Sequence, residues 1–437
     1  MSLIARYFFL CMMATLMCHV ALWAADTPPE PLQYTNHIYR PFIKTVTTHA
    51  ANNSLSYPIV PLQGGVISIG FDDLRPNPVY YNYQLIYCNA NWQAVENLST
   101  FDYLNGFSQD QIADFSFSTG TQIPYIHYQL NIPNSNMQPK KSGNYLLVVY
   151  EDQWQQPVLT RRLMFYENIA QIETQWYSAM GMQSNTYQRL SCKVDFSDKD
   201  YNNPMEQIKL CVLQNGRWDN AQLNVPPTFW DFRSLRYDSP NILQFEAGND
   251  FRFVDNRLTV PFRRNKKQVL PPSEDKDTSA ANILQKNDAL RNRSEQRFRV
   301  ANSDYNGKFA IGNSRGLFRW SDADYTLVRF RLNAPQLPDS TKVYLHGALT
   351  DWEISPVFAL AYNPDSKFFE TLLYLKQGIH DYQYLAYIPN QLDVSPHQIT
   401  EGNFVNTEND YLILVYYRTF TQAYDRLVGY RLLNTFR

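Results

Sequence analysis

Two short stretches of the chain hold residue types that could perform chemistry, and the first is Gly312 to Gly316. Its G-x-S-x-G spacing is that of a nucleophile elbow, in which a strand leads into the serine and a helix follows it. Lys308 to Ile311 fits the strand, but Leu317 to Trp320 predicts a further strand where the elbow needs a helix. We therefore interpret Ser314 as part of a polar turn, and the sequence disfavours the alternative of a serine hydrolase.

The second stretch resembles the start of a calcium-binding loop, with Asp198, Asp200 and Asn202 at alternate positions. The sixth position is Asn203 where glycine is required, and the twelfth is Lys209 where glutamate should chelate the ion. A hairpin turn is the better interpretation. The seven histidines include no H-x-x-x-H or H-x-H pair. The sequence therefore predicts no catalytic residue, no metal site and no cofactor.

Other titratable residues have structural explanations. His127 and His346 lie in predicted strands, where a hydrogen-bonded histidine is usually part of the structure. The carboxylate neighbours Asp72-Asp73 and Glu151-Asp152 flank predicted turns, and adjacent side chains on a strand point to opposite faces. We expect these carboxylates to be solvated turn residues.

The N-terminal residues 1–25 have the pattern of a secretory signal peptide. Arg6 precedes an uncharged apolar run from Tyr7 to Trp23, and Ala24-Ala25 follows it. A membrane anchor is the competing interpretation, although the run is at the short limit for a span of about 20 residues. Cys18 is a poor match to a lipoprotein site, because a small residue normally precedes the lipid-bearing cysteine.

Removal of that segment leaves Cys88, Cys192 and Cys211. With an odd count, at least one thiol is free or pairs with another chain. Cys192 and Cys211 lie on successive predicted strands and could form a disulfide. We favour the simpler interpretation that all three are small core residues.

Composition predicts a large all-β protein. The chain has 437 residues, of which 44% are hydrophobic and 15% aromatic, and a length of ~150 residues per domain suggests three domains. Abundant tyrosine and phenylalanine favour half-buried sheets over helices. The formal net charge of -2 provides no basic field for phosphates, which argues against nucleic acid as a partner.

The first predicted domain spans residues 26–168 and begins with an extended, proline-rich leader. Seven strand-like runs with proline-rich or Gly-Asn turns between them predict an immunoglobulin-like β-sandwich. They are Phe42 to Thr47, Val66 to Phe71, Tyr80 to Cys88, Phe115 to Phe117, Tyr125 to Ile132, Tyr145 to Tyr150 and Val158 to Tyr166.

The second predicted domain, residues 169–312, continues in the same way and contains a charged loop at 263–293. The composition of this segment argues against core. We expect a short helix from Ala280 to Leu290, with Ser279 as its cap. Arg263, Arg264, Lys266 and Lys267 could contact anionic lipid headgroups, but solubility is the commoner reason for such a run.

The third predicted domain, residues 313–437, is organised around an antiparallel meander from Val343 to Tyr387. Along Phe368 to Lys376, Phe369 and Leu375 fall on one face while Tyr374 and Lys376 fall on the other. The sequence as a whole predicts tandem immunoglobulin-like β-sandwich domains.

The turn Gly347 to Trp352, with the Tyr382-x-Tyr384 strand after Gly378, resembles the glycogen- and starch-binding sandwich modules. Exposed aromatics in those modules stack on sugar rings. The resemblance covers about the last hundred residues and implies, as an alternative function, a periplasmic or surface glycan-binding protein that uses Trp352. The turn Gln214 to Asn220 is a second cluster of polar and aromatic residues.

A larger set of motifs resembles the plug-protein family of the type IX secretion system. These motifs span nearly all of the chain in the family's order, and only Arg263 to Arg293 matches no part of the pattern. They are Phe71-Asp72-Asp73-Leu74, Tyr87-Cys88-Asn89-Ala90-Asn91-Trp92, Tyr103-Leu104-Asn105-Gly106-Phe107, Ser142-Gly143-Asn144-Tyr145, Leu159-Thr160-Arg161-Arg162, Gln214 to Asn220, Gly248-Asn249-Asp250-Phe251-Arg252, Lys376-Gln377-Gly378 and Tyr416-Tyr417-Arg418.

This resemblance implies a non-enzymatic protein of the periplasm, peripheral to the outer membrane rather than spanning it. Its implied partner is the giant outer-membrane β-barrel translocon of the type IX secretion system. The protein would block the pore when no substrate is in transit. The resemblance identifies no contact residue.

Overall fold

The computed structural model describes residues 30–151, 156–196, 203–231, 233–258, 283–291, 304–313, 320–389, 391, 394–422 and 424–436. Several features singled out in the sequence lie outside these residues: the expected signal peptide, Cys18, the calcium-like loop residues Asp198 to Asn202, the basic run Arg263 to Lys267, and Ser314. The described chain is nearly all β, as predicted.

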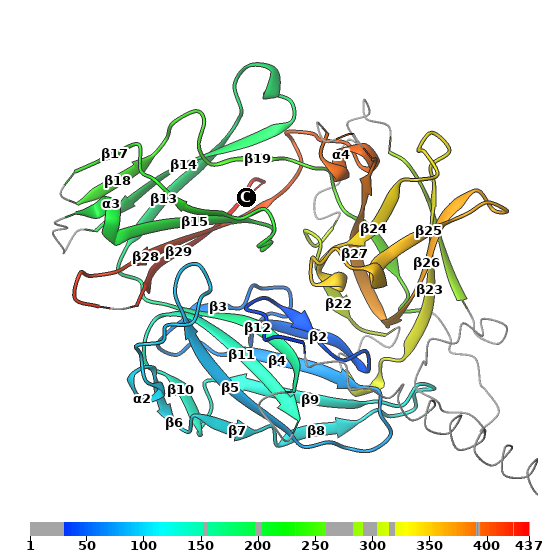
Figure 1. Ribbon diagram of the computed structural model, residues 1–437, viewed down its shortest axis with the longest axis horizontal. Helices are drawn as coiled ribbons and strands as arrows, with labels where there is room; N and C mark the ends of the chain where they lie inside the picture. Colours follow the sequence, from blue (N-terminus) through cyan, green and yellow to red (C-terminus); the bar gives the residue numbers. More distant parts are fainter. Residues whose placement is uncertain are drawn as a thin grey trace, which may run out of the picture.

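Strand pairing divides the described chain into three units, which Figure 1 shows below, at upper left and at right. We call residues 30–168 the first unit. The second unit combines residues 169–248 with 405–436, and the third unit comprises the described residues between 249 and 404. Each unit has its own hydrophobic core.

The first unit is a sandwich of two sheets, and it contains all seven strands predicted for it. The sheet orders are β1-β12-β11-β5-β7, with β3 beside β12, and β2-β4-β9-β8, and a separate hairpin pairs β10 with β6. Alternation explains the core: Tyr81, Tyr83, Leu85 and Tyr87 of β5 all point inward. The elements are β1 (His37–Ile38), β2 (Ile43–Ala50), β3 (Ile59–Pro61), β4 (Ile67–Asp73), β5 (Tyr81–Cys88), α2 (Thr100–Tyr103), β6 (Leu104–Gly106), β7 (Gln109–Gln111), β8 (Asp114–Phe117), β9 (Ile126–Ile132), β10 (Met137–Pro139), β11 (Gly143–Glu151) and β12 (Pro157–Tyr166).

The second unit is completed by the two last strands of the chain. Its sheets have the orders β13-β14-β18-β17, with β19 beside β14, and β16-β15-β28-β29. The elements are β13 (Gln171–Ser178), η1 (Gly181–Gln183), β14 (Tyr187–Asp195), α3 (Pro204–Gln207), β15 (Ile208–Gln214), β16 (Gln222–Val225), β17 (Phe229–Trp230), β18 (Ser234–Tyr237), β19 (Gln244–Glu246), β28 (Asp410–Tyr417) and β29 (Arg426–Asn434).

The expected boundaries at 169–312 and 313–437 therefore need correction. β28 pairs with β15 along its whole length, and its inward residues Tyr411, Ile413 and Val415 belong to the core of the second unit. The chain thus leaves the second unit, builds the third and returns.

The third unit has one sheet path, β20-β27-β24-β25-β26-β23-β21, with β22 beside β27. β20 and β22 were expected in the second domain, but both pair with β27. The elements are β20 (Arg252–Asp255), β21 (Ile283–Ala289), β22 (Phe309–Ile311), η3 (Trp320–Asp322), β23 (Tyr325–Asn333), β24 (Lys342–His346), η4 (Ala348–Thr350), η5 (Pro356–Phe358), β25 (Ala359–Asn363), β26 (Phe368–Lys376), β27 (Gly378–Tyr387) and α4 (Pro396–Thr400).

Two sequence-based expectations are wrong in this unit. The segment expected as a helix, Ala280 to Leu290, contains strand β21, because β23 offers it a parallel ladder from Ile283 opposite Leu327 onward. The meander is also not continuous. β27 pairs with β24 rather than with β26, so the chain changes its strand partners at the Gln377 turn.

Cys88, Cys192 and Cys211 are free and buried, as the favoured interpretation predicted, and no disulfide joins Cys192 to Cys211. Burial raises the pKa of the Cys88 and Cys211 thiols to about 12 and that of Cys192 to about 11. These thiols are therefore protonated core groups.

Candidate functional site

The first and second units share an apolar junction. It is a hydrophobic cluster separate from the cores of the two units, and the β12 side of the first unit lies against β28 and β29 in Figure 1. Burial of this kind resembles a core rather than a transient contact. Its buried members are Tyr57, Ile59, Cys88, Ala90, Trp92, Leu146, Val148 and Met164 of the first unit and Cys211, Leu213, Leu412, Leu414, Tyr416 and Leu427 of the second.

Arg162 closes one side of this junction. Its guanidinium carbon lies 4.6 Å from the ring centroid of Trp92 and 4.7 Å from that of Trp218, one ring from each unit. Its Nε donates to the carbonyl of Tyr34 at 2.9 Å. Burial lowers the pKa of Arg162 to about 10, which leaves it charged and attracted to both rings.

The turn between β28 and β29 is held against the first unit by the buried Asp425. Its carboxylate accepts a hydrogen bond from the Ala90 backbone N–H at 2.9 Å. Within the second unit it binds Lys209 and Arg418 at 3.1 and 2.9 Å. The C-terminal strands therefore both complete the second unit and attach it to the first.

A buried ion pair joins the first unit to the third. Lys376 Nζ lies 2.7 Å from Asp72 Oδ2, and both side chains have 0% exposure. Asp72 also contacts His127 Nδ1 at 2.7 Å and accepts from Tyr325 Oη at 2.6 Å. Burial alone would raise the pKa of Asp72, but the Lys376 charge and the His127 hydrogen bond outweigh burial and lower it.

This arrangement overturns the expectation that Asp72 and Asp73 are solvated. Asp73 is also fully buried, and it accepts hydrogen bonds from Arg75 and Tyr81 on the opposite side of β4. Glu151 pairs with Arg75 instead of facing only water. The alternation along the strand was predicted correctly. The environment was not, because the third unit and a neighbouring arginine supply the positive charges.

A second charged contact between the first and third units involves Arg161, whose side chain is 2% exposed. Its Nη2 donates to Asp351 Oδ2 at 2.9 Å. β1 takes part as well, since Nδ1 of its first residue, His37, lies 2.6 Å from Glu353 Oε1. Burial would lower the pKa of His37, but the Glu353 carboxylate more than compensates and raises it.

All three units meet at Asp410, the first residue of β28. Tyr57 Oη of the first unit donates to Asp410 Oδ2 at 2.8 Å. Lys308 Nζ of the third unit lies 3.6 Å from the same oxygen and 4.0 Å from the Tyr57 ring centroid. One carboxylate thus fixes the relative positions of three sandwiches.

The second and third units meet where the two aromatic turns from the sequence come together. The Arg217 guanidinium carbon lies 5.1 Å from the Trp352 ring centroid. Trp352 is half-buried, and its ring also packs against His346 and Phe251. A Cβ at Gly307 would lie 2.3 Å from Trp352 Cη2, so this position needs glycine. Trp352 is therefore a packing residue, and its neighbours occupy surface that sugar stacking would need.

A polar cavity of about 260 Å³ lies beside this contact. In its wall, Nε2 of His397 in α4 lies 3.2 Å from Oε2 of Glu246 in β19. Amides dominate its wall, but most of them already bond to one another, as Asn220 does to Gln214 at 2.9 Å. Other lining residues are Asn215, Arg217, Asn249 and Gln383.

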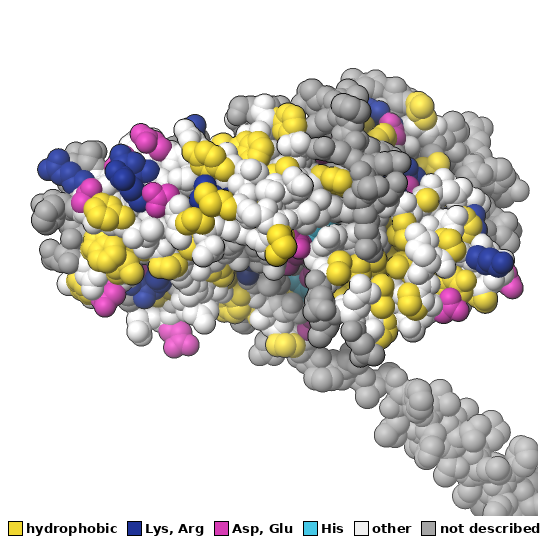
Figure 2. Space-filling model, turned by 90° about the horizontal axis from the view of Figure 1, so that it is seen from above, with side chains coloured by type: hydrophobic (Ala, Val, Ile, Leu, Met, Phe, Trp, Pro, Cys, Tyr) yellow, Lys and Arg dark blue, Asp and Glu magenta, His cyan; other side chains and the backbone are white. Residues whose placement is uncertain are grey.

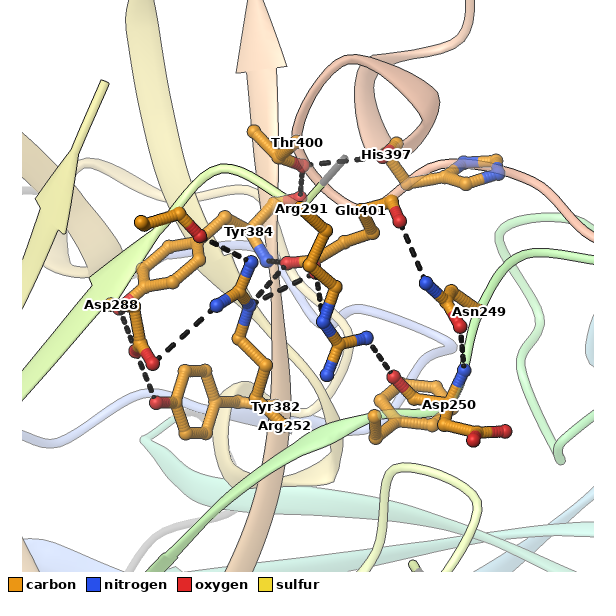
Figure 3. Close-up of polar contacts among 12 residues, drawn as sticks. Asn249, Asp250, Arg252, Asp288, Arg291, Tyr382, Tyr384, His397, Thr400 and Glu401 are labelled. Carbon is orange, nitrogen blue, oxygen red and sulfur yellow. Dashed lines mark hydrogen bonds and ion pairs between the residues drawn. The ribbon is translucent and has the colours of Figure 1, made fainter. Parts of the chain in front are cut away.

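A buried network of charged residues lies next to this cavity, and Figure 3 shows its contacts. The network fixes β21 in the third unit. Arg252 Nε donates to both Glu401 oxygens at 3.0 and 2.9 Å, and its Nη1 lies 3.4 Å from Asp288 Oδ1. Tyr382 and Tyr384 both donate to Asp288, at 2.6 and 2.9 Å. Although burial opposes it, the Glu401 charge raises the pKa of Arg252.

The predicted structural roles of His127 and His346 are confirmed. Both are buried in strands and hydrogen-bonded, His127 to Asp72 and His346 to the Trp352 carbonyl. Burial lowers the pKa of His346 to about 3, so it is neutral at physiological pH. Gly312, two residues before Ser314, donates its N–H to the Gln377 carbonyl at 3.0 Å.

Within the described residues, no group of three histidine, cysteine, aspartate or glutamate side chains is placed to hold a metal ion. In the same part of the chain, no helix combines the length and apolar character needed to cross a membrane.

These features define the class of the protein: three interlocked β-sandwich units held by buried ionic and aromatic contacts. Residues 43–167 match the family described as the first domain of the type 9 secretion system plug protein. No curated protein matches the chain.

A crystal structure of a hypothetical protein from Parabacteroides merdae is similar over 92% of this chain and 100% of its own, with 30% identity and a TM-score of 0.81. The chain therefore belongs to the same family as that protein.

Two other solved structures have TM-scores of 0.15 at 8% identity and carry no argument. They are the C-terminal domain of the Streptococcus pyogenes antigen I/II-family protein AspA, matched over 90% of this chain and 99% of its own, and the BSP domain of a biofilm associated protein, matched over 93% and 83%. The matched family model does not describe a glycogen- or starch-binding module, so that resemblance stays a prediction.

Most motifs that carry the plug-family resemblance lie at the contacts between units. Asp72 and Lys376 form the buried pair, Arg161 and Arg162 reach the third and second units, and Tyr416 Oη donates to Asn144 across the apolar junction at 2.9 Å. The sequence signal was a charged or polar residue inside an otherwise apolar strand. It pointed to these positions without revealing their partners.

Proposed function

We propose that this protein is a non-enzymatic plug of the type IX secretion system. It binds the periplasmic mouth of the outer-membrane translocon and occludes the pore when no substrate is in transit. The match of residues 43–167 to the plug-protein first domain carries this proposal.

The geometry supports the proposal in a second way. A protein that blocks a large pore must keep its shape while it is bound there. In this protein, every pair of units is joined by buried contacts. One carboxylate, Asp410, binds groups from two other units. Such contacts disfavour hinge motion between the units, because separation of the units would leave buried charges without their partners.

The test is affinity purification of the tagged protein from gently solubilised outer membranes. We expect a giant β-barrel without cargo to co-purify with the protein in a stoichiometric amount. The interface between the two should bury more than about 1,000 Å². A deletion strain should then admit bulky antibiotics that the parent excludes. Recovery of the protein alone, free in the periplasm, contradicts the plug function.

The glycan-binding alternative is not favoured by a specific observation. Its central residue, Trp352, packs against Arg217, His346 and Phe251. A glycan-array signal abolished by Trp352→Ala in a variant that remains folded would restore that alternative.

A further inference from the structure

The first unit ends in an open sheet edge. β8 pairs with β9 on one side, and among the described residues no strand pairs with its other side. All four β8 residues are exposed, including Phe115 at 39% and Phe117 at 57%. Figure 1 shows β8 with β7 at the bottom of the molecule, away from the second unit. An apolar open edge is a template for another strand.

The backbone of β8 is oriented to accept such a strand. Ser118 N–H donates to the Tyr125 carbonyl at 2.9 Å, so this residue faces β9. Backbone groups alternate along an antiparallel strand, and therefore Ser116 and Asp114 also face β9. The N–H and C=O groups of Phe115 and Phe117 consequently point away from β9. They are the groups that an added strand would pair with.

The phenylalanine side chains of β8 continue the hydrophobic core of the first unit to the open edge of the sheet. Phe115 and Phe117 contact each other with ring centroids 6.1 Å apart, and Phe115 lies 5.7 Å from the buried Tyr128. The edge strand of the facing sheet, β7, is polar and leaves them exposed. An incoming strand would cover these rings with apolar side chains on one of its faces.

Charge indicates what the other face of that strand should carry. Asp114 of β8 and Asp110 of β7 are the charged residues of these two edge strands, and neither strand contains a lysine or arginine. Asp114 lies on β8 itself, on the face opposite to the two phenylalanines. A segment with Lys or Arg at alternate positions would complement this surface.

Another exposed aromatic edge of the molecule differs in charge. Phe229 and Trp230 of β17 are 54% and 47% exposed, but Arg236 lies opposite Phe229 and Arg233 is nearby in sequence. Figure 2 shows basic, acidic and hydrophobic side chains together at that end of the second unit. β17 is therefore a matched control with similarly exposed rings that has an arginine, Arg236, directly opposite one of them.

We propose that the β8 edge docks an extended segment of the translocon by strand addition. The segment alternates apolar residues, which cover Phe115 and Phe117, with basic residues, which face Asp114. Main-chain hydrogen bonds give this mode its affinity, and the alternating side chains give its specificity. The inference rests on the proposed plug function and adds the contact surface to it.

The test uses the full-length tagged protein with a photo-crosslinking phenylalanine derivative at position 117 or, as control, at position 229. Irradiation of intact cells should join the barrel to position 117 and not to position 229. Mass spectrometry should map the cross-link to a segment with alternating basic and apolar residues. A cross-link to exported cargo, or equal barrel cross-links at both positions, overturns the inference.

Variants give an independent measurement. We expect Phe115→Asp/Phe117→Asp to reduce barrel recovery at least about tenfold, because aromatic anchors dominate such interfaces. Phe229→Asp/Trp230→Asp should leave recovery unchanged. Phe117→Pro, which removes one outward N–H, should also reduce it. Unchanged recovery with the β8 variants refutes strand docking while the plug function stands; absence of the barrel from wild-type preparations refutes both.

Discussion

The contact between the first and third units differs from that between the second and third. Asp72 and Lys376 in the former have 0% exposed side chains. In the latter, Arg217 and Asp219 are 14% and 36% exposed and lie beside a cavity of about 260 Å³. A dry ion pair cannot replace a lost partner with water, whereas a polar cavity wall can. We therefore expect the first contact to be rigid and the second to yield first.

Lys376→Ala should have the largest effect on stability. It leaves the Asp72 carboxylate buried without its main counter-charge, which typically costs about 3–5 kcal/mol. The measurement is the urea unfolding midpoint, with Lys342→Ala on the exposed side of β24 as control. The double variant Asp72→Leu/Lys376→Met should recover most of the loss. A single variant within about 1 kcal/mol of wild type would show that water enters this contact.

Trp352→Ala should cost less, about 2–3 kcal/mol, because the ring packs on three neighbours but is only half-buried. Thermal unfolding of this variant should be compared with that of Trp230→Ala, whose ring is exposed. Equal midpoints for the two variants would contradict the packing role assigned to Trp352.

Mild acid should weaken the second contact before the first. The pKa of His346 falls from the usual 6.5 to about 3, so the unfolded chain binds its proton more readily and stability is lost as the pH falls below 6.5. This histidine alone should cost about 2 kcal/mol at pH 5. The lowered pKa of Asp72, caused by the Lys376 charge and the His127 hydrogen bond, keeps its carboxylate charged at a lower pH than an ordinary aspartate.

Hydrogen exchange at pH 7.5 and 5.0 measures this difference. Amides near Trp352 should lose protection at pH 5.0 while those near Asp72 keep it, and His346→Gln should reduce the change. Equal loss of protection at both contacts would argue against the distinction.

Arg217→Met should have the smallest effect, about 1 kcal/mol, from loss of its contact with Trp352 and of a partly exposed ion pair with Asp219. Arg257→Met provides a control, because Arg257 also pairs with a nearby aspartate but lies at a more exposed position. A loss as large as that of Lys376→Ala would mean that the two contacts do not differ in kind.

Local patterns in the sequence were sufficient to predict where most strands lie. They were insufficient to predict which strands pair with one another. Apolar and aromatic runs between proline-rich or Gly-Asn turns identified β5 and β12. Nothing local could show that Tyr411 to Tyr417 would pair with β15 instead of with the strands just before it. β21 was mistaken for part of a helix because Ser279, a few residues before it, fits a helix cap. Its parallel partner is β23, and their register places Ile283 opposite Leu327, 44 residues further on in sequence.

The contacts between units were predicted least well. Asp72-Asp73 was interpreted as solvated because the compensating charges, Lys376 and Arg75, could not be assigned to it from sequence. The motif resemblance nevertheless pointed to many of the same residues. It identified positions that matter for assembly, without the physical reason.

The return of β28 and β29 to the second unit has a consequence for the order in which the protein can assemble. A ribosome makes the first unit early, and such a unit can fold alone. The core of the second unit must wait until the whole third unit has been synthesised, because Tyr411, Ile413 and Val415 come after it. A chain cut after residue 404 would thus lose the core of the second unit and the contact of Asp425 with the first unit, although its last residue belongs to the third unit. Proteases that remove incomplete chains would therefore encounter an unfolded second unit, which lies in the middle of the chain.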